Sequence, residues 1–404
     1  MNKKHQRLKQ IQENMKQKDQ LNKGEENHYR MYWDYTSYYS NKLRSYLNYK
    51  EIPYKLMQTT LDDYQRLIPK LVGMPIIPVV LTPDDQVMQD STPMMEWFEK
   101  EYSHKSAIPK DQRLAFIMWA IEEFSDEYLV RFAMRTRWGA EGGQNTLSAR
   151  IARGFTYGQQ SEMIKMGSKM ILSRQSGFNE ALGLATEEEC KSVDQQYLDM
   201  LAILDKHLSD YSYLLGDRPS LADFAFFGPL WAHGFNDPDS AQILEVNAPQ
   251  VCNWLQEMAN LGDSRGGLGR TDFGGWIDID GGVPESLIEL LSFINKTYLP
   301  QAKGYRHAML NSDSSIKVDI YGTQSQIPAW NYRAGTYAQL QKRFTLLNVQ
   351  QQEWLENALT PSGLLPALME GGIHENPQFE GLTAPFVTNP ALNKLAYKGD
   401  KPLS

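Results

Sequence analysis

The chain has 404 residues, and at roughly 150 residues per domain this length predicts two or three domains. Hydrophobic residues make up 41% and charged residues 22%, as in ordinary globular proteins, and no run approaches the ~18 apolar residues of a membrane span. A formal net charge of −8 argues against a general nucleic-acid-binding role. The two cysteines, Cys190 and Cys252, offer neither a disulfide framework nor a cysteine-based metal site, so a reducing, cytoplasmic setting is expected.

Residues 1–28 form a charged leader with seven basic and four acidic side chains. The segment has no apolar core, which excludes a secretory signal, and its acids and lack of serine argue against a transit peptide. We interpret it as a solvated helical leader. The alternative is a basic arm that docks on an acidic partner.

Residues 29–104 alternate between short strands and helices. Strands are predicted at 29–33, within 51–58 and along the apolar run 76–81, with 86–88 pairing back as a hairpin. Helices are predicted from Ser40 onward, over 62–70 and over 91–102, the last with Ser91 as its N-cap. This order predicts a small α/β domain with a mixed sheet.

Strand signals disappear over residues 109–260, which predicts an all-helical domain. One apolar stripe fits a long helix over 111–137, and further helices are predicted over 150–173, 186–208 and 221–231. The last of these is nearly all apolar and is expected at the centre.

Two pairs of residues in this domain have the spacing of capping boxes: Thr186 with Glu189, and Ser220 with Asp223. We interpret Asp223 as a cap, so its loss should lower stability by about 1 kcal/mol or more rather than abolish an activity directly.

Residues 261–404 form a C-terminal extension. Glycine and aspartate dominate 262–282, which predicts a long loop or hinge. Helices are predicted over 284–298, 331–344 and 349–359, and the residues after Gly371 have little periodicity.

Three local motifs follow one another in a characteristic order. They are Ser37-Tyr38-Tyr39-Ser40-Asn41-Lys42-Leu43-Arg44, Ile77-Pro78-Val79-Val80 followed by Asp90-Ser91, and Pro219-Ser220-Leu221-Ala222-Asp223. Together they resemble the glutathione transferases, of a serine type found in bacteria, over roughly residues 29–260. The resemblance implies a thioredoxin-like N-terminal domain, an all-helical glutathione-transferase C-terminal domain with a helical extension, and a homodimer.

The resemblance also implies that Ser37, just before the first helix, lowers the pKa of the glutathione thiol, with Tyr38 and Tyr39 beside it. A helix N-terminus favours a thiolate, because it carries about half a positive charge and free N–H donors. Tyr38 replaces the family's usual proline, which leaves open whether the hydroxyl of Tyr35, Tyr38 or Tyr39 takes this role. Alternatively, Ser37 or Ser40 simply caps the helix, and by position Ser40 is the better cap.

Two further segments are implied to bind glutathione. A cis bond between Ile77 and Pro78 would let the Ile77 backbone pair with the extended tripeptide, and Pro75 is the competing position. Asp90 suits the γ-glutamyl ammonium, and Ser91 at a helix N-terminus suits the carboxylate of the same group. The alternative for Ser91 is an N-cap alone.

Other chemistries have little support. Seven scattered histidines lack ligand spacing, and no glycine-rich loop ends in Lys-Ser or Lys-Thr, so neither a metal site nor a phosphate loop is predicted. An arginine of the 111–137 helix could hold the glycine carboxylate or an anionic substrate, but a solvated face or an ion pair on that helix is the preferred interpretation. The arginines are Arg131, Arg135 and Arg137, and the expected partners are Glu122, Glu123 and Asp126.

The expected function is a glutathione transferase that activates the glutathione thiol for attack on a small hydrophobic electrophile, as in detoxification, without a metal. The alternative is a non-catalytic binding or scaffold protein on the same fold. Tyr38 in place of proline and the long extension favour this alternative. The extension could cover the cleft or the usual dimer face, or it could line a deeper pocket with Trp330, Tyr332 and Tyr337. Truncation near Gly262 would show whether the extension is a lid over the cleft or a part of the core.

Overall fold

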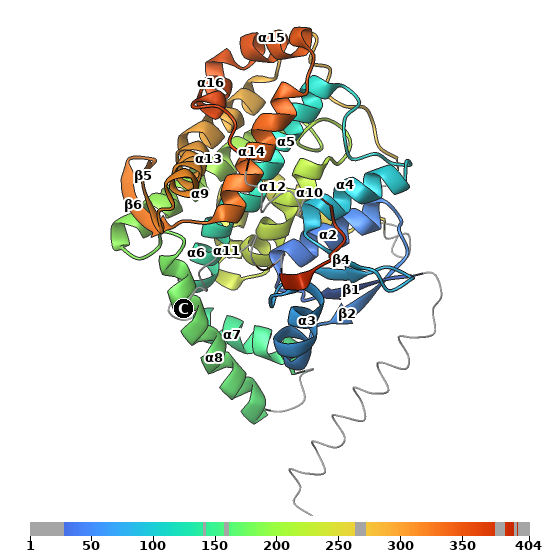
Figure 1. The fold of residues 1–404 in the computed structure, drawn as a ribbon, viewed down its shortest axis with the longest axis vertical. Coiled ribbons are helices and arrows are strands. Elements are labelled where there is room, and N and C mark those ends of the chain that lie inside the picture. Colours follow the sequence, from blue (N-terminus) through green and yellow to red (C-terminus); the bar gives the residue numbers. More distant parts are fainter. Residues whose placement is uncertain are drawn as a thin grey trace, which may run out of the picture.

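The N-terminal part of the chain is built on a four-stranded sheet (Figure 1). The computed structural model describes residues 28–139, 143–156, 161–262, 272–375, 384–391 and 394. The strands are β1 (Tyr29–Trp33), β2 (Tyr54–Gln58), β3 (Val79–Leu81) and β4 (Val87–Gln89), in the order β2-β1-β3-β4. Strand β1 runs parallel to β2 and antiparallel to β3, which confirms the predicted mixed sheet.

Helices α2 (Tyr38–Tyr49) and α4 (Ser91–Glu101) pack on this sheet, while a π-helical turn η1 (Asp63–Leu67) leads into α3 (Ile68–Val72). The apolar face of α2 is fully buried, as predicted, since Leu43, Tyr46 and Leu47 have no exposed surface. The predicted helix over 62–70 is therefore a π-helical turn and a short α-helix.

The following part of the chain is all-helical, as expected. The predicted helix over 111–137 is two helices, α5 (Gln112–Tyr128) and α6 (Val130–Trp138), which meet at Leu129. The predicted helix over 150–173 is likewise divided, since α7 (Gly143–Phe155) ends before α8 (Ser161–Glu180) begins. The remaining elements are α9 (Glu187–Asp210), α10 (Leu221–Pro229), a π-helical turn η2 (Leu230–Phe235), α11 (Pro238–Asn247) and α12 (Pro249–Ala259).

Helix α10 lies at the centre, and all nine of its residues are buried. A Cβ on Gly228 would lie 2.7 Å from the Tyr38 carbonyl oxygen, so glycine allows α10 to approach α2 closely. Both predicted capping boxes are present, with Thr186 and Glu189 opening α9 and Ser220 and Asp223 opening α10.

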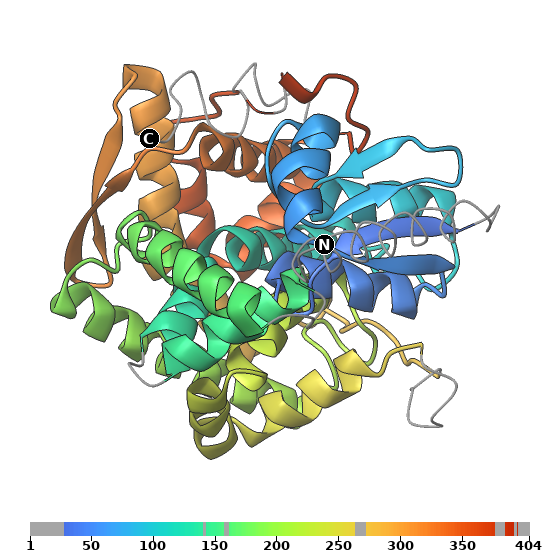
Figure 2. The same cartoon turned by 90° about the horizontal axis from the view of Figure 1, so that it is seen from below.

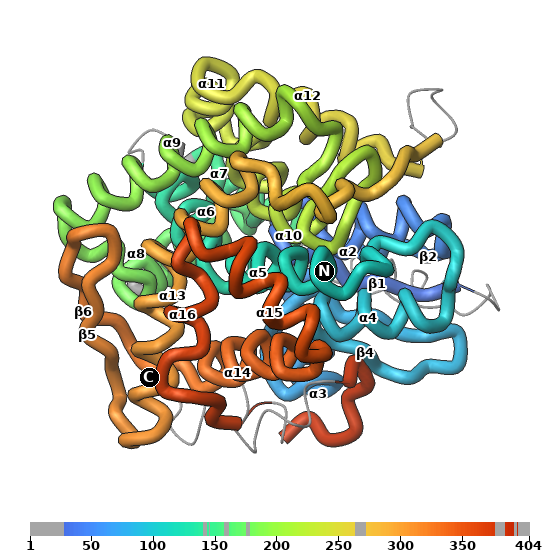
Figure 3. The backbone as a smooth tube through the Cα atoms, turned by 90° about the horizontal axis from the view of Figure 1, so that it is seen from above, coloured from blue at the N-terminus to red at the C-terminus, as the bar shows by residue number. Residues whose placement is uncertain are grey.

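The extension folds into the same core rather than forming a separate unit. It comprises α13 (Glu285–Asn311), β5 (Ser315–Ile320), β6 (Thr323–Pro328), α14 (Asn331–Thr345), α15 (Val349–Ala358), a short 3-10 turn (Thr360–Ser362) and α16 (Leu364–Met369). Its helices lie beside α5 (Figure 3), where Phe344 packs on Phe116 and Phe293 packs on Phe124. The β5–β6 hairpin was not predicted, and α13 continues through Pro300 beyond the predicted end at 298.

Two outlying segments cover the N-terminal sheet domain. Helices α7 and α8 project below the helical body toward α3 (Figures 1 and 2), and Arg174 of α8 donates to the Tyr64 hydroxyl of η1. Residues 384–391 run along β4, where Gln89 N donates to Pro385 O and Val387 N donates to Val87 O. The C-terminal segment therefore covers the outer edge of the sheet.

Some expectations fall on residues that the structure does not describe. The predicted leader lies almost wholly within residues 1–27, and residues 263–271 of the predicted glycine-rich loop are also outside the described ranges. Within the described ranges, no helix is both long enough and apolar enough to span a bilayer.

Candidate functional site

Ser37 stands at the N-terminus of α2. It has an extended backbone, and its Oγ accepts a hydrogen bond from Ser40 N at 3.4 Å, so Ser37 and not Ser40 is the N-cap. The prediction that Ser40 is the better cap is wrong, because the helix begins at Tyr38 and buries Ser40 inside its first turn. A hydroxyl has one donor and two acceptor positions, so accepting the cap bond leaves the Ser37 proton for a second partner.

The loop before Ser37 is held by a buried arginine. Arg137 Nη1 donates to Thr36 O at 2.8 Å, and Arg137 Nε donates to Asp237 Oδ2 at 2.7 Å. Arg137 thus pairs with Asp237, and Arg135 with Asp194, rather than with the acids of α5. Arg131 donates mainly to the Leu182 carbonyl and the Tyr128 hydroxyl. All three arginines therefore hold elements of the helical domain together.

The hydroxyls of the three neighbouring tyrosines are already engaged by the helical domain. Tyr38 and Tyr39 both donate to Asp126 O, at 2.6 and 2.8 Å, and Tyr35 donates to Arg150 O at 3.2 Å. Burial raises the pKa of Tyr38 and of Tyr39 well above the ordinary value of a tyrosine. Since each phenol has a single proton, these contacts favour Ser37 over the tyrosines as a donor to sulfur.

The two remaining predicted segments flank the end of the sheet. The Ile77–Pro78 bond is cis, as the sequence resemblance implies, and Pro78 is buried immediately before β3. Asp90 is the N-cap residue of α4, with φ of 74°, and Ser91 is the first helical residue, 4% exposed. The prediction that Ser91 is the N-cap is thus off by one residue. The Asp90 carboxylate makes no capping bond, and its Oδ2 accepts from the Tyr332 hydroxyl at 2.6 Å.

A buried charge cluster lies where α2, α4 and α5 meet. Lys42 Nζ is 2.7 Å from Glu122 Oε1, 2.6 Å from Asp126 Oδ2 and 2.9 Å from Thr92 Oγ1. Burial alone would lower the pKa of Lys42, but Asp126 and Glu122 more than offset it and raise that pKa. Burial raises the pKa of Asp126 to about 7. Sequence reasoning missed this cluster, although two acidic pairs inside the otherwise apolar 111–137 stripe were a signal for it.

The start of α14 also reaches this region. Arg333 Nε lies 3.1 Å from Glu127 Oε2, Arg333 Nη1 donates to the Tyr305 hydroxyl at 3.0 Å, and the guanidinium stacks on Trp330 at 4.6 Å. Of the aromatic residues suggested to line a deeper pocket, Tyr332 reaches Asp90, while Tyr337 donates to Leu368 O within the extension.

Models of two known domain families match this chain, one in the sheet domain and one in the helical domain. The model "Glutathione S-transferase, N-terminal domain" matches residues 31–106, and "Glutathione S-transferase, C-terminal domain" matches residues 163–261. The chain carries both domains of the glutathione S-transferase family. No curated protein matches it significantly.

Solved structures with similar folds are distant from this chain in sequence. The β-etherase LigF from Sphingobium sp. strain SYK-6 is 18% identical, with 59% of this chain and 96% of that one covered and a TM-score of 0.44. A glutathione transferase family member from Pseudomonas fluorescens Pf-5, with two glutathione bound, is 17% identical over 58% and 88% of the chains, with a TM-score of 0.33. The tau class transferase MiGSTU from mango is 18% identical over 57% and 88%, with a TM-score of 0.34. The family assignment rests on the two family models.

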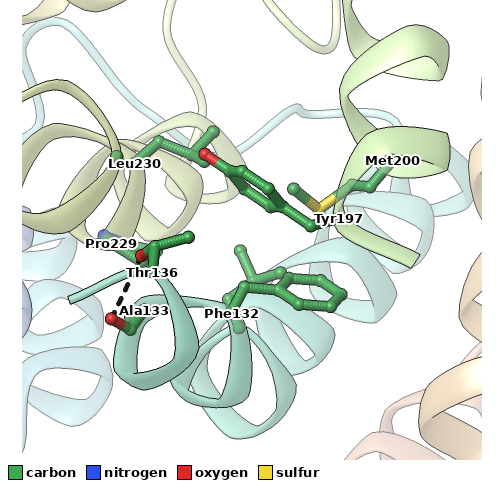
Figure 4. Close-up of a pocket in the computed structure, with 9 residues that line it drawn as sticks. Phe132, Ala133, Thr136, Tyr197, Met200, Pro229 and Leu230 are labelled. Carbon is green, nitrogen blue, oxygen red and sulfur yellow. Dashed lines mark hydrogen bonds between the residues drawn. The ribbon is translucent and has the colours of Figure 1, made fainter. Parts of the chain in front are cut away.

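A small cavity of about 10 Å³ lies inside the transferase helical region between α6, α9 and α10 (Figure 4). The buried Tyr197 hydroxyl, which has no hydrogen-bond partner among the described residues, lines it together with Phe132 and Met200. This volume is enough for about one water molecule, so the cavity is not a substrate pocket. In the part of the chain that the structure describes, no three side chains of the metal-binding types are grouped as ligands.

Proposed function

We propose that this protein binds glutathione at the N-termini of α2 and α4 and transfers it to a small hydrophobic electrophile. The observation that carries the proposal is the position of Ser37. It caps α2 with its hydroxyl proton still available, while the hydroxyls of Tyr35, Tyr38 and Tyr39 donate to backbone carbonyls. The proposal includes the homodimer and the detoxifying role that family resemblance implies, and the cytoplasmic location expected from the two cysteines.

In the proposed complex, Asp90 accepts from the γ-glutamyl ammonium and Ser91 N–H and hydroxyl bind the neighbouring carboxylate. The Ile77 backbone pairs with the extended tripeptide next to β3. Tyr38 and Tyr39 position the start of α2 by joining it to α5.

Ser37 Oγ then donates to the sulfur, and the free N–H groups of the first turn of α2 add to the stabilisation of the thiolate. The thiol proton leaves to solvent. The sulfur forms a bond to the electrophilic carbon, and the electron pair of the broken bond departs with the leaving group.

The second candidate is a binding or scaffold protein on the same fold. The observation that favours it is the Tyr332 hydroxyl, which already occupies one oxygen of Asp90. In this case glutathione would either fail to bind or bind without forming a thiolate.

The first experiment is calorimetric titration of glutathione into the full chain, with ultraviolet difference spectra to detect bound thiolate at neutral pH. Ser37→Ala should remove the thiolate signal, whereas the control Ser40→Ala should leave it unchanged, because Ser40 is buried and its hydroxyl has no partner among the described residues. Absence of binding by the wild type at millimolar concentration would overturn the proposal. Binding without a thiolate signal would favour the scaffold protein.

A further inference from the structure

The turn between β4 and α4 is held by two separate parts of the C-terminal extension. The Tyr332 hydroxyl of α14 donates to Asp90 Oδ2 at 2.6 Å. On the preceding residue, Gln89 N donates to Pro385 O at 2.8 Å, and Phe386 stacks edge-on against Trp97 of α4. Both parts lie outside the two matched family domains, which end at residues 106 and 261.

The start of α14 is fixed where it meets this turn. Next to Tyr332, the buried Arg333 is paired with Glu127 of α5 at 3.1 Å and stacked on Trp330 at 4.6 Å. Further along the helix, Arg343 is paired with Glu96 of α4 at 2.5 Å and lies over the Trp119 ring at 3.6 Å. The helix that places the Tyr332 hydroxyl next to Asp90 is therefore held by contacts with both α4 and α5.

Asp90 accepts a hydrogen bond from the Tyr332 hydroxyl instead of capping its own helix. Its carboxylate makes no bond to the N-terminus of α4, and its backbone φ of 74° is in the left-handed region that few non-glycine residues adopt. The carboxyl groups of Asp126 and Glu127 are close enough to interact electrostatically with it. A phenol donor fixes the orientation of the carboxylate that accepts its hydrogen bond.

We propose that Tyr332 is a positioning residue of the glutathione site, which orients the Asp90 carboxylate toward the γ-glutamyl ammonium. This inference rests on the proposed function and adds to it that the extension completes the binding site. Tyr332 acts through Asp90, so its contribution should depend on the ammonium of the ligand.

The test compares two ligands on the full chain by calorimetry: glutathione, and its analogue in which hydrogen replaces the γ-glutamyl amino group. We expect Tyr332→Phe to weaken glutathione binding by about three- to tenfold and to leave binding of the analogue unchanged. The matched control is Tyr337→Phe, which removes a hydroxyl from the same helix that donates to Leu368 O and not to Asp90. The control should bind both ligands like the wild type.

The outcomes separate the two proposals. If the wild type binds glutathione and Tyr332→Phe binds it equally well, the positioning role is overturned and the proposed function stands. Equal weakening for both ligands would show a purely structural role and would also overturn the inference. If Tyr332→Phe binds glutathione more tightly, the hydroxyl competes with the ligand for Asp90 and the positioning role is overturned. Failure of the wild type to bind glutathione overturns the proposed function and this inference together.

Discussion

Asp126 connects three parts of the candidate site. Its carboxylate pairs with Lys42 of α2 and accepts from Thr92 of α4, and its backbone carbonyl accepts from Tyr38 and Tyr39. Its second carboxylate oxygen, Oδ1, is buried and has no hydrogen-bond partner among the described residues. Burial therefore dominates at this residue and raises its pKa to about 7 from the ordinary value of 3.8.

This shift predicts a pH dependence of stability. Because the folded protein binds the proton more tightly than the unfolded chain, the contribution of Asp126 is fully present below its unfolded pKa and lost as the pH rises through about 7. In the wild type, the free energy of unfolding should fall as the pH rises toward about 7. We expect Asp126→Asn to make this fall less steep, by at most about 1.4 kcal/mol per pH unit. Urea unfolding at about pH 5, 6 and 7 measures it.

The control is Asp194→Asn, which removes a half-exposed carboxylate paired with Arg135. It should leave the pH dependence unchanged. A slope in Asp126→Asn equal to that of the wild type would contradict the assignment.

At the scale of elements, the two capping boxes are similar in sequence but differ in their wider contacts. Among the described residues, Glu189 bonds only locally, to Ala185 N and to Thr186. Asp223 caps Ser220 and also accepts from Leu214 N at 2.9 Å and Trp254 Nε1 at 3.3 Å, with no exposed surface. Asp223 thus satisfies buried donors on three separate segments.

We expect Asp223→Ala to lower the free energy of unfolding by about 3 kcal/mol, and Glu189→Ala by about 1 kcal/mol. The difference arises because alanine at 223 leaves the Leu214 and Trp254 N–H groups buried without acceptors. Urea unfolding of both variants measures the two losses. Equal losses would show that the wider contacts of Asp223 contribute nothing.

Elements with strong local signals were predictable from sequence. The first strand, the α9 capping box and the α14–α15 pair follow from apolar periodicity and cap residues within a few positions. The β5–β6 hairpin also had a local signal that was missed, since buried and exposed residues alternate along Ser315–Ile320 on one side of the Tyr321-Gly322 turn.

Other features depend on contacts between distant residues and left no local signal. The break at Leu129 separates α5 from α6 without a proline or glycine, and residues 385–387 pair with β4 without any strand-like periodicity. For the candidate site, the motifs predicted Ser37, Ile77–Pro78 and Asp90–Ser91, whereas the contact of Tyr332 with Asp90 joins residues 242 positions apart. Contacts between residues so far apart in the sequence leave no local sequence pattern.

For the whole molecule, the extension is a part of the core. Phe293 and Tyr298 of α13 pack on Phe124, and Phe344 of α14 packs on Phe116. Removing the extension would expose these aromatic faces of α5. The free energy lost with several buried aromatic contacts is larger than the free energy of unfolding of a typical domain.

We therefore expect a chain that ends at residue 262 to unfold or aggregate, as judged by circular dichroism, gel filtration and binding of a hydrophobic dye. A chain that ends at residue 375 keeps α13 to α16 and should fold cooperatively, although it lacks the segment on β4. A stable, cooperatively folded chain ending at 262 would show that the extension only covers a complete two-domain fold.

The pairing of β4 with residues 385–387 has a consequence for protein synthesis. Roughly 300 residues separate the two partners, so at about 5–20 residues per second the ribosome needs roughly 15–60 s to supply the second after the first. During that interval the edge of β4 offers unpaired backbone groups to other chains. The nascent protein cannot complete the pairing of β4 until residues 385–387 have been synthesised, and chains that terminate before them would leave this edge of the sheet uncovered.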